Sequence, residues 1–197
     1  AVRDILDGAT WQHWATLNDV LPLLAEASPS AFLAAVEDSL QATDCPFDEL
    51  FKQEGDGALT GGTYISGLLW ALETLAWAPD LFIRSIHCLA QLAERDPGGK
   101  WSNRPINSLR TILLPWLPLT CADVPKRISA VEILIKDLPR VAWSLLLKLF
   151  PESHSTSNGT RRPAWRSWIP EDWKKGVSEE EYWHQTGAYA RLATEMA

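Results

Sequence analysis

The chain has 197 residues and a formal net charge of −7 at pH 7, and 46% of its residues are hydrophobic. This length and composition allow one large folded domain or a run of helical repeats with a substantial core. They exclude a membrane-spanning helix, because no apolar run reaches the ~20 residues that a bilayer requires.

The charges are unevenly distributed along the chain. Residues 1–99 carry 4 Lys or Arg and 15 Asp or Glu, whereas residues 100–175 carry 13 and 6. The middle of the chain can therefore present a basic surface on an acidic protein. The simpler interpretation, which we favour, is that these charges solvate the outer faces of helices.

The three cysteines, Cys45, Cys88 and Cys121, are odd in number and far apart, and the four histidines are equally dispersed. Neither set has the spacing of a metal site, and the cysteines do not form a disulfide framework. We therefore expect no metal, no cofactor, and a reducing, cytoplasmic location. The opening residues 1–4 have the character of the middle of a helix, which indicates a fragment of a longer protein.

The first third of the chain predicts a series of short helices. Apolar side chains at i, i+3 and i+7 spacing mark a helix after Thr10, and Pro22 inside this pattern predicts a kink or a division into two helices. Ser28 followed by proline is a typical helix start. A short helix near residues 47–51 follows. The glycine-rich stretch 55–62 predicts a flexible loop, because it lacks the Lys-Ser/Thr pair of a phosphate-binding P-loop.

Residues 67–118 are the central stretch of the chain and predict a helical hairpin followed by a third helix. An apolar helix over residues 68–77 ends before Pro79, and a second helix over residues 80–94 follows at once, so the two form an αα-hairpin. A polar loop then leads to a third helix that begins at Pro105. The side chains expected to be largely buried are Leu68, Leu69, Leu72, Leu75 and Ile86.

Three further helices are expected in the second half of the chain. Asp123 caps the first, and Pro139 opens a second that is apolar nearly all round and is therefore expected to lie between neighbouring helices. Ser178 and Glu181 form the capping box of the last. The polar residues 152–159 predict a disordered loop.

An internal repeat is visible in this pattern. The dipeptides at 28–29, 78–79 and 138–139 each end in proline and separate two apolar helices. Because a single hairpin cannot bury its apolar stripe, stacked hairpins are the economical arrangement.

We therefore predict an all-α fold of about eight to ten helices. Its expected parts are an α-solenoid-like array of helical hairpins over residues 1–150, an irregular Trp- and Arg-rich segment over residues 151–177, and a C-terminal helix over residues 178–197. This last helix is expected to pack on the same domain.

The first candidate interaction site is the loop and helix start at residues 100–110. It brings an aromatic ring, two carboxamides and two guanidiniums to a helix N-terminus, which attracts anions. Its residues are Trp101, Asn103, Arg104, Asn107 and Arg110. The competing interpretation, which we favour, is that Asn103 and Arg104 bind neighbouring carbonyls and carboxylates. In both cases we expect an ordered junction, because residues 96–99 end one helix and Pro105 starts the next.

The second candidate site is the basic, Trp-rich stretch 161–173. Tryptophans interleaved with basic residues can stack on the bases of single-stranded nucleic acid. The candidate residues are Arg161, Arg162, Trp165, Arg166 and Trp168. The acidic total charge argues against strong nucleic-acid binding, so we expect these residues to pack within the protein.

The sequence contains no catalytic motif. It has no G-x-S-x-G elbow, no H-E-x-x-H helix and no G-x-G-x-x-G turn. Glu73 and Asp80 flank the hairpin turn, where caps or solvated charges are more common than an acid–base pair. We therefore predict no catalytic residue and no enzyme activity for this chain.

The string GLLWALETLAW, with LAERDPGGKWSNRPINSLRTILLPWLP after it, resembles a segment of large uncharacterised bacterial multidomain proteins. The resemblance covers residues 67–173. Some of these proteins resemble P-loop NTPases of the STAND type with C-terminal helical arrays. The resemblance implies a helical module downstream of an NTPase, and it carries over no functional residue because the segment contains no catalytic motif.

These features predict a non-catalytic interaction or scaffold module, such as the sensing arm of a larger bacterial NTPase. Its expected partner is another protein or another domain of the parent chain, and neither nucleic acid nor a membrane is expected. Two alternatives stay open: an enzyme domain with an anion-binding pocket around residues 101–110, and nucleic-acid binding by the basic middle of the chain.

Overall fold

The computed structural model describes residues 1–53, 63–151 and 159–197. Eleven α-helices and no strand occur in these ranges, so the predicted all-α class is confirmed. The loop predicted for residues 55–62, and all but the last residue of the loop predicted for 152–159, lie outside the described residues.

The helices in chain order are α1 (Val2–Leu6), α2 (Trp11–Thr16), α3 (Leu21–Ala27), α4 (Pro29–Gln41), α5 (Pro46–Lys52), α6 (Ser66–Leu75), α7 (Phe82–Arg95), α8 (Pro105–Leu113), α9 (Val124–Asp137), α10 (Pro139–Leu149) and α11 (Glu179–Met196). The described ranges thus hold more helices than the expected eight to ten. One reason is that the helix expected after Thr10 divides into α2 and α3. Pro22 lies in the first turn of α3, where a missing N–H costs nothing.

Local sequence signals set several helix starts. Prolines occupy the first turn of α4, α5, α8, α9 and α10. The Asp123 carboxylate accepts a hydrogen bond from the backbone N–H of Lys126 at 2.9 Å, as predicted for an N-cap. At α11, Ser178 Oγ accepts from the Glu181 backbone N–H at 3.2 Å, and Glu181 Oε2 accepts from the Ser178 N–H at 3.0 Å. The predicted capping box is therefore confirmed.

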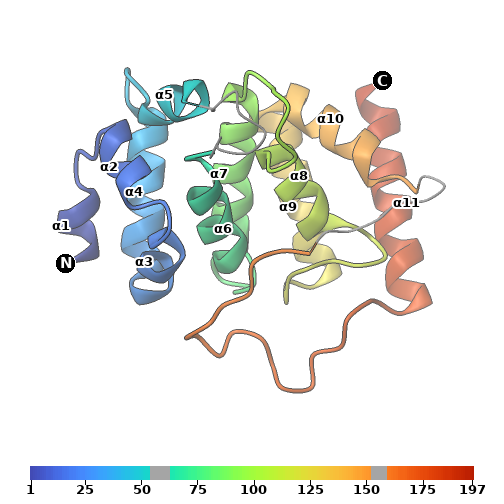
Figure 1. Ribbon diagram of the computed structural model, residues 1–197. Coiled ribbons are helices and arrows are strands. Elements are labelled where there is room, and N and C mark those ends of the chain that lie inside the picture. Colours follow the sequence, from blue (N-terminus) through green and yellow to red (C-terminus); the bar gives the residue numbers. More distant parts are fainter. Residues whose placement is uncertain (54–62, 152–158) are drawn as a thin grey trace.

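The helices lie side by side in approximate chain order, from α1 at one end to α11 at the other (Figure 1). The pair α3–α4 packs on the pair α6–α7, with α3 against α6 and α4 against α7. Helix α7 continues the contact to α8, α9 and α10, and α11 packs on α9 and α10. The α3–α4 and α6–α7 pairs thus pack on each other, and α7 joins them to the C-terminal helices.

Two of the three hairpin junctions have nearly the same backbone. Ser28 ends α3 and begins α4 with φ −147° and ψ 78°, and Leu138 ends α9 and begins α10 with φ −139° and ψ 60°. Proline follows both residues. The junction between α6 and α7 is longer and spans residues 76–81. The internal repeat itself stays a prediction.

One hydrophobic core extends from Val2 to Leu192. Near the N-terminal end, the fully buried ring of Trp14 packs edge-on against Phe32 and Phe47, with ring centroids 6.1 and 5.1 Å apart. All five side chains expected to be buried in the central hairpin are buried. They are Leu68, Leu69, Leu72, Leu75 and Ile86.

A close approach of backbones joins the first two pairs. The backbone N–H of Gly67, at the start of α6, donates to Asn18 Oδ1 at 2.8 Å. A Cβ atom on residue 67 would lie 1.8 Å from the Asn18 carbonyl oxygen. Only glycine therefore allows α6 to begin at this position.

Helix α10 differs from its prediction. It contacts α7, α8, α9 and α11, but Trp143 and Leu147 on its outer side are exposed. Its apolar circumference is therefore only partly enclosed by neighbouring helices. Trp183 of α11 is also exposed, whereas Tyr189 and Leu192 of the same helix are buried.

A buried polar cluster attaches α11 to the array. Arg127 of α9 donates from Nε to Gln185 Oε1 at 2.8 Å and from Nη1 to the Ala122 carbonyl at 2.6 Å. Gln185 donates in turn to the Leu113 carbonyl and to the Tyr189 hydroxyl. Burial lowers the pKa of the Arg127 guanidinium and raises that of the Tyr189 phenol. In the described ranges no helix is both long and apolar enough to cross a membrane.

Candidate interaction site

The two stretches selected from the sequence meet at α6. One is the junction loop, residues 96–104, which connects α7 to α8. The other is the strap, residues 159–177, which has no helix and runs from the side of α6 and α8 to α3 and then back to α11 (Figure 1). The irregular, Trp-rich segment expected before the C-terminal helix is confirmed for these residues.

The junction loop is held by a buried ion pair. Arg104 is only 5% exposed, and its Nη1 donates to Asp96 Oδ1 at 2.9 Å while its Nε donates to the Trp101 carbonyl at 3.3 Å. Asp96 Oδ1 also accepts from the backbone N–H of Gly98, which has a φ of 79°. The prediction of an ordered junction, with Arg104 bound to a carboxylate, is therefore confirmed.

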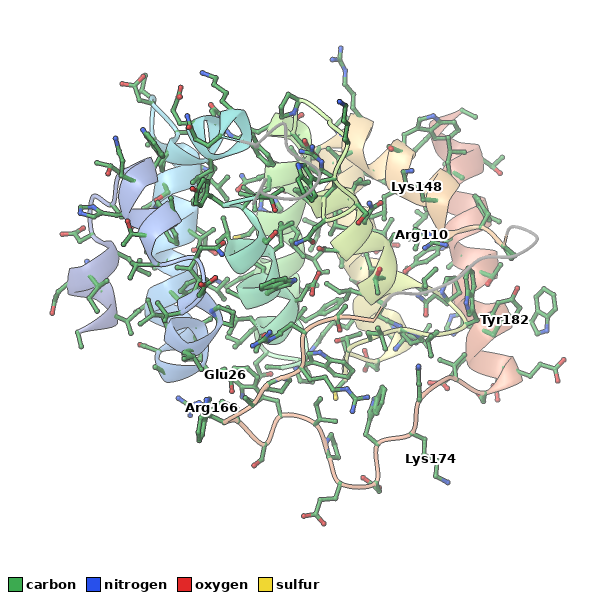
Figure 2. The ribbon with its side chains drawn as sticks, in the orientation of Figure 1. Glu26, Arg110, Lys148, Arg166, Lys174 and Tyr182 are labelled. Carbon is green, nitrogen blue, oxygen red and sulfur yellow. The ribbon has the colours of Figure 1, made fainter. Side chains whose placement is uncertain are left out.

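The other candidate residues of this stretch have internal partners as well. Asn103 Nδ2 donates to Ser66 Oγ at 2.8 Å, and Asn107 Nδ2 donates to the Ser102 carbonyl at 2.7 Å. Arg110 Nε donates to the Lys148 carbonyl at 3.2 Å, which ties α8 to α10 (Figure 2). Trp101 is half-buried.

The strap is attached to α3 through the buried carboxylate of Glu26. This carboxylate accepts backbone N–H groups from three successive strap residues, Ala164, Trp165 and Arg166, at 2.6 to 3.1 Å. The Arg166 guanidinium donates to the carbonyls of Glu26 and Ala27 at 2.7 and 3.3 Å. It therefore satisfies the C-terminal carbonyls of α3, which favour a cation. Figure 2 shows Glu26 and Arg166 together at this point.

A second attachment joins the strap to α6. Glu73 Oε2 accepts the backbone N–H of Arg161 at 3.0 Å, and Glu73 Oε1 accepts the Ser108 hydroxyl at 2.6 Å. The Trp77 indole N–H donates to the Arg161 carbonyl at 3.0 Å. Burial raises the pKa of the Glu73 carboxyl, while the hydrogen bonds from Ser108 and Arg161 partly offset this effect.

Aromatic contacts complete the attachment. The Arg162 guanidinium lies 5.3 Å from the ring centroid of Trp77 and 4.9 Å from that of Trp173, within cation–π distance of both. Trp168 is half-buried against the core. Trp165, by contrast, is 78% exposed. The expectation that this stretch packs within the protein therefore holds only in part: Arg162, Arg166 and Trp168 contact the rest of the chain, but Arg161, Arg162, Trp165 and Arg166 are exposed.

A pocket of about 440 Å³ opens where the junction loop and the strap meet. It brings together Asn103 and Asn107 from the first candidate site and Arg161 from the second, beside Trp70 and Glu73 of α6. The other candidate residues lie outside its lining. They are Trp101, Arg104, Arg110, Arg162, Trp165, Arg166 and Trp168.

The sequence interpretation missed both carboxylates that hold the strap. Glu73 was expected to be a cap or a solvated charge, and this is wrong because only 7% of the residue is exposed. A signal was present, since Glu73 is the one charged residue in the apolar helix α6. Glu26 gave a weaker signal, because it lies four residues after the buried Pro22 on the same face of α3.

A second concave feature, the α4 groove, lies at the N-terminal end of the array and measures about 880 Å³. One side is the outer face of α4, where Ala31, Ala34 and Ala35 form a floor of small side chains. The other sides are the α1–α2 connection and α5. Small side chains let the backbone of a second helix come close.

The rim of the α4 groove is acidic. Asp7, Asp38 and Asp44 line it, are exposed, and form no ion pair with any residue that the structure describes. Asp48 and Glu49 also line it but are paired with Arg95 and Lys52. The described lining also holds Arg3 and Lys52, but its five carboxylates outnumber these two cations, so the groove keeps a net negative charge.

Comparison with protein-family models, curated protein sequences and solved structures finds no match to the chain. Within residues 1–53, 63–151 and 159–197, no group of three His, Cys, Asp or Glu side chains is arranged to hold a metal ion. A functional proposal therefore rests on the geometry and the sequence of the chain itself.

Proposed function

We propose that the chain is a non-catalytic interaction module that binds a basic helical segment of a partner protein in the α4 groove. The observation that carries this proposal is the combination of a small-residue floor on α4 with three unpaired carboxylates on the rim. Recognition of a helix in a groove uses this arrangement, in which close backbone packing gives area and rim charges fix the register.

Helix α7 supports the choice of a basic helix, because it already binds the opposite side of α4 in this way. Arg84 of α7 donates from Nε and Nη2 to both carboxylate oxygens of Glu37 at 2.8 and 2.7 Å. Arg95, three turns later, donates to Asp48 at 2.9 Å and to the Leu40 carbonyl at 3.1 Å. A partner helix with arginines at similar spacing would place them against the free rim carboxylates.

The proposal is tested with a fluorescein-labelled helical peptide that has alanines on one face and two arginines at the spacing of Arg84 and Arg95. We expect fluorescence anisotropy to detect binding at low ionic strength and to show weakening as salt is added. The double variant Asp38→Lys/Asp44→Lys should lower the affinity at least about tenfold, because it reverses the rim charge.

The matched control is the double variant Glu171→Lys/Asp172→Lys, which makes the same charge change at two exposed positions of the strap. It should leave the affinity within about twofold of the unchanged protein, because it lies outside the groove. Equal binding of a peptide with glutamates in place of arginines, or equal loss in the control, contradicts the proposal.

The wider setting is proposed from the sequence resemblance alone. We place the module in the cytoplasm of a bacterium, as the sensing arm of a P-loop NTPase whose helical hairpins repeat as an α-solenoid. The three cysteines, Cys45, Cys88 and Cys121, are free thiols, in keeping with a reducing compartment. The sequence of the parent protein tests the setting, since it requires a P-loop upstream of this chain.

The two alternative functions receive less support from the geometry. An anion pocket around residues 101–110 needs guanidiniums directed outward, whereas Arg104 is buried against Asp96. Nucleic-acid binding by the strap would use Arg161, Arg162 and Arg166, which are exposed. Two of these guanidiniums already have internal partners, since Arg162 lies against Trp77 and Trp173 and Arg166 donates to the Glu26 carbonyl. We expect weak or no binding of single-stranded oligonucleotides at physiological salt. A steeply salt-dependent, sub-micromolar affinity that is lost on substitution of Arg161 and Arg162 would contradict this expectation.

A further inference from the structure

The pocket between the junction loop and the strap has an unusual lining. Ligand pockets are as a rule mostly apolar, but none of the described residues that line this one has an aliphatic side chain. Its described lining includes Trp70, Glu73, Asn103, Asn107, Thr160 and Arg161. One aromatic ring among hydroxyls and carboxamides indicates a ligand that is polar on its edges and has an apolar face.

The charges of the pocket indicate a neutral ligand. Among the described residues of the lining, Glu73 and Arg161 are the ionisable ones, and their formal charges cancel. An anion would meet the carboxyl of Glu73, and a cation would meet the guanidinium of Arg161. A molecule without net charge meets neither penalty.

The hydrogen-bonding groups favour a ligand whose groups both donate and accept. Each carboxyl oxygen of Glu73 accepts one bond from the chain, which leaves a lone pair on each for a donor. The hydroxyl of Thr160 is buried and has no hydrogen-bond partner among the described residues, although buried hydroxyls are as a rule bonded. Hydroxyl groups of a ligand satisfy both kinds of protein group.

Trp70 supplies the apolar contact. Its side chain lines the pocket and is 37% exposed, and the Arg161 guanidinium lies 5.7 Å from its ring centroid. The ring position is fixed by α6, whose next turn is tied to α8 and the strap through Glu73. A rigid aromatic surface beside fixed polar groups is a preorganised site.

We propose that this pocket binds a small neutral polyol, such as a single sugar unit, with Trp70 packed against the ring carbons and Glu73 accepting a hydroxyl. The pocket is distinct from the α4 groove, and the two share no lining residue. The failure of one proposal therefore leaves the other standing.

Saturation-transfer NMR on the intact chain tests this proposal with a panel of glucose, galactose, mannose and N-acetylglucosamine, and titration calorimetry measures any hit. We expect at least one sugar to bind with millimolar or better affinity, and Trp70→Ala to weaken it at least about tenfold. The matched control is Trp143→Ala, because Trp143 is also 37% exposed but lies on α10 outside the pocket. The control should bind as the unchanged protein does.

Glu73→Gln supplies a second variant, since it keeps the size of the side chain but replaces one acceptor oxygen by a donor. Its fold is checked by circular dichroism, and it should also weaken the sugar at least about threefold. Three results overturn the proposal. The first is no saturation transfer to any sugar at about 10 mM, a concentration roughly ten times a millimolar dissociation constant. The others are sugar binding that survives Trp70→Ala, and preferential binding of inorganic phosphate or free arginine, which are included as charged probes.

Discussion

The strap and the α4 groove contain carboxylates in opposite situations. At the strap, the carboxylates of Glu26 and Glu73 are buried, and each accepts hydrogen bonds from backbone or hydroxyl groups of the chain. At the α4 groove, the carboxylates of Asp7, Asp38 and Asp44 are exposed and form no ion pair with a described residue. Buried, satisfied carboxylates hold the fold together, whereas exposed, unpaired ones are available to a partner. The five predictions that follow test this distinction, from the largest expected effect to the smallest.

The largest loss of stability is expected from a truncated side chain in the hydrophobic core. Leu72 of α6 is fully buried, so Leu72→Ala should lower the free energy of unfolding by about 2–5 kcal/mol through lost contacts and a cavity. Urea denaturation measures this change. Leu23→Ala, at an exposed position of α3, is the control and should cost less than about 0.5 kcal/mol. A loss of similar size in both variants would show that the core boundary is wrong.

Breaking the buried pair of the junction loop should have the next largest effect. Arg104→Ala leaves Asp96 buried without its guanidinium, which should cost about 3 kcal/mol. The midpoint of urea unfolding measures the loss. The control is Arg191→Ala, which removes an exposed i,i+4 pair with Glu195 and should cost less than about 1 kcal/mol. An unchanged midpoint for Arg104→Ala would mean that the partner of Arg104 is external.

Releasing the strap from α3 should lower the free energy of unfolding somewhat less than Arg104→Ala does. Glu26→Ala removes the acceptor of three backbone N–H groups, and we expect a loss of about 2 kcal/mol, since bonds to a charged group contribute more than neutral ones. Hydrogen exchange should show lost protection at Ala164, Trp165 and Arg166. Glu94→Ala, exposed on α7, should change neither quantity. Retained protection at the strap would mean that Glu26 does not hold it.

The raised pKa of Glu73, the second carboxyl that holds the strap, should make the free energy of unfolding depend on pH. The folded-state pKa of Glu73 lies above its unfolded value, so the folded state binds more protons in the window between the two. Stability contributed by this group is therefore greatest at low pH and falls as the pH rises from about 4.3 through the folded pKa. The unfolding free energy of the unchanged protein minus that of Glu73→Gln should decrease over this window. An increase of this difference with pH would mean that folding lowers the pKa of Glu73 and would contradict the prediction.

The groove carboxylates should have the smallest effect on stability. Asp38→Ala and Asp44→Ala should each change the free energy of unfolding by less than about 0.5 kcal/mol, because both side chains are exposed and neither forms an ion pair with a described residue. Thermal melting measures this, beside the peptide affinity described above. If either variant lowered the free energy of unfolding as much as Glu26→Ala, Asp38 or Asp44 would be a stabilising residue and not a free binding group.

Helix identity could be predicted from the sequence because its signals are local. The proline-led starts of α4, α8 and α10, the cap at Asp123 and the capping box at Ser178 each act within one turn of backbone. The apolar spacing of the central hairpin likewise fixes its buried face. These signals are sufficient for the all-α class and for the ordered junction at Arg104.

The candidate sites, by contrast, were assembled only by the tertiary structure. Glu26 meets strap residues 138 to 140 positions away, and Glu73 meets the strap 88 positions away. The α4 groove similarly combines the α1–α2 connection with α4 and α5. Sequence spacing cannot encode such meetings, because a carboxylate on a helix has the same local pattern whether a distant loop or water satisfies it. Which charges hold the fold and which remain for a ligand is therefore decided by how the strap and the helix pairs pack.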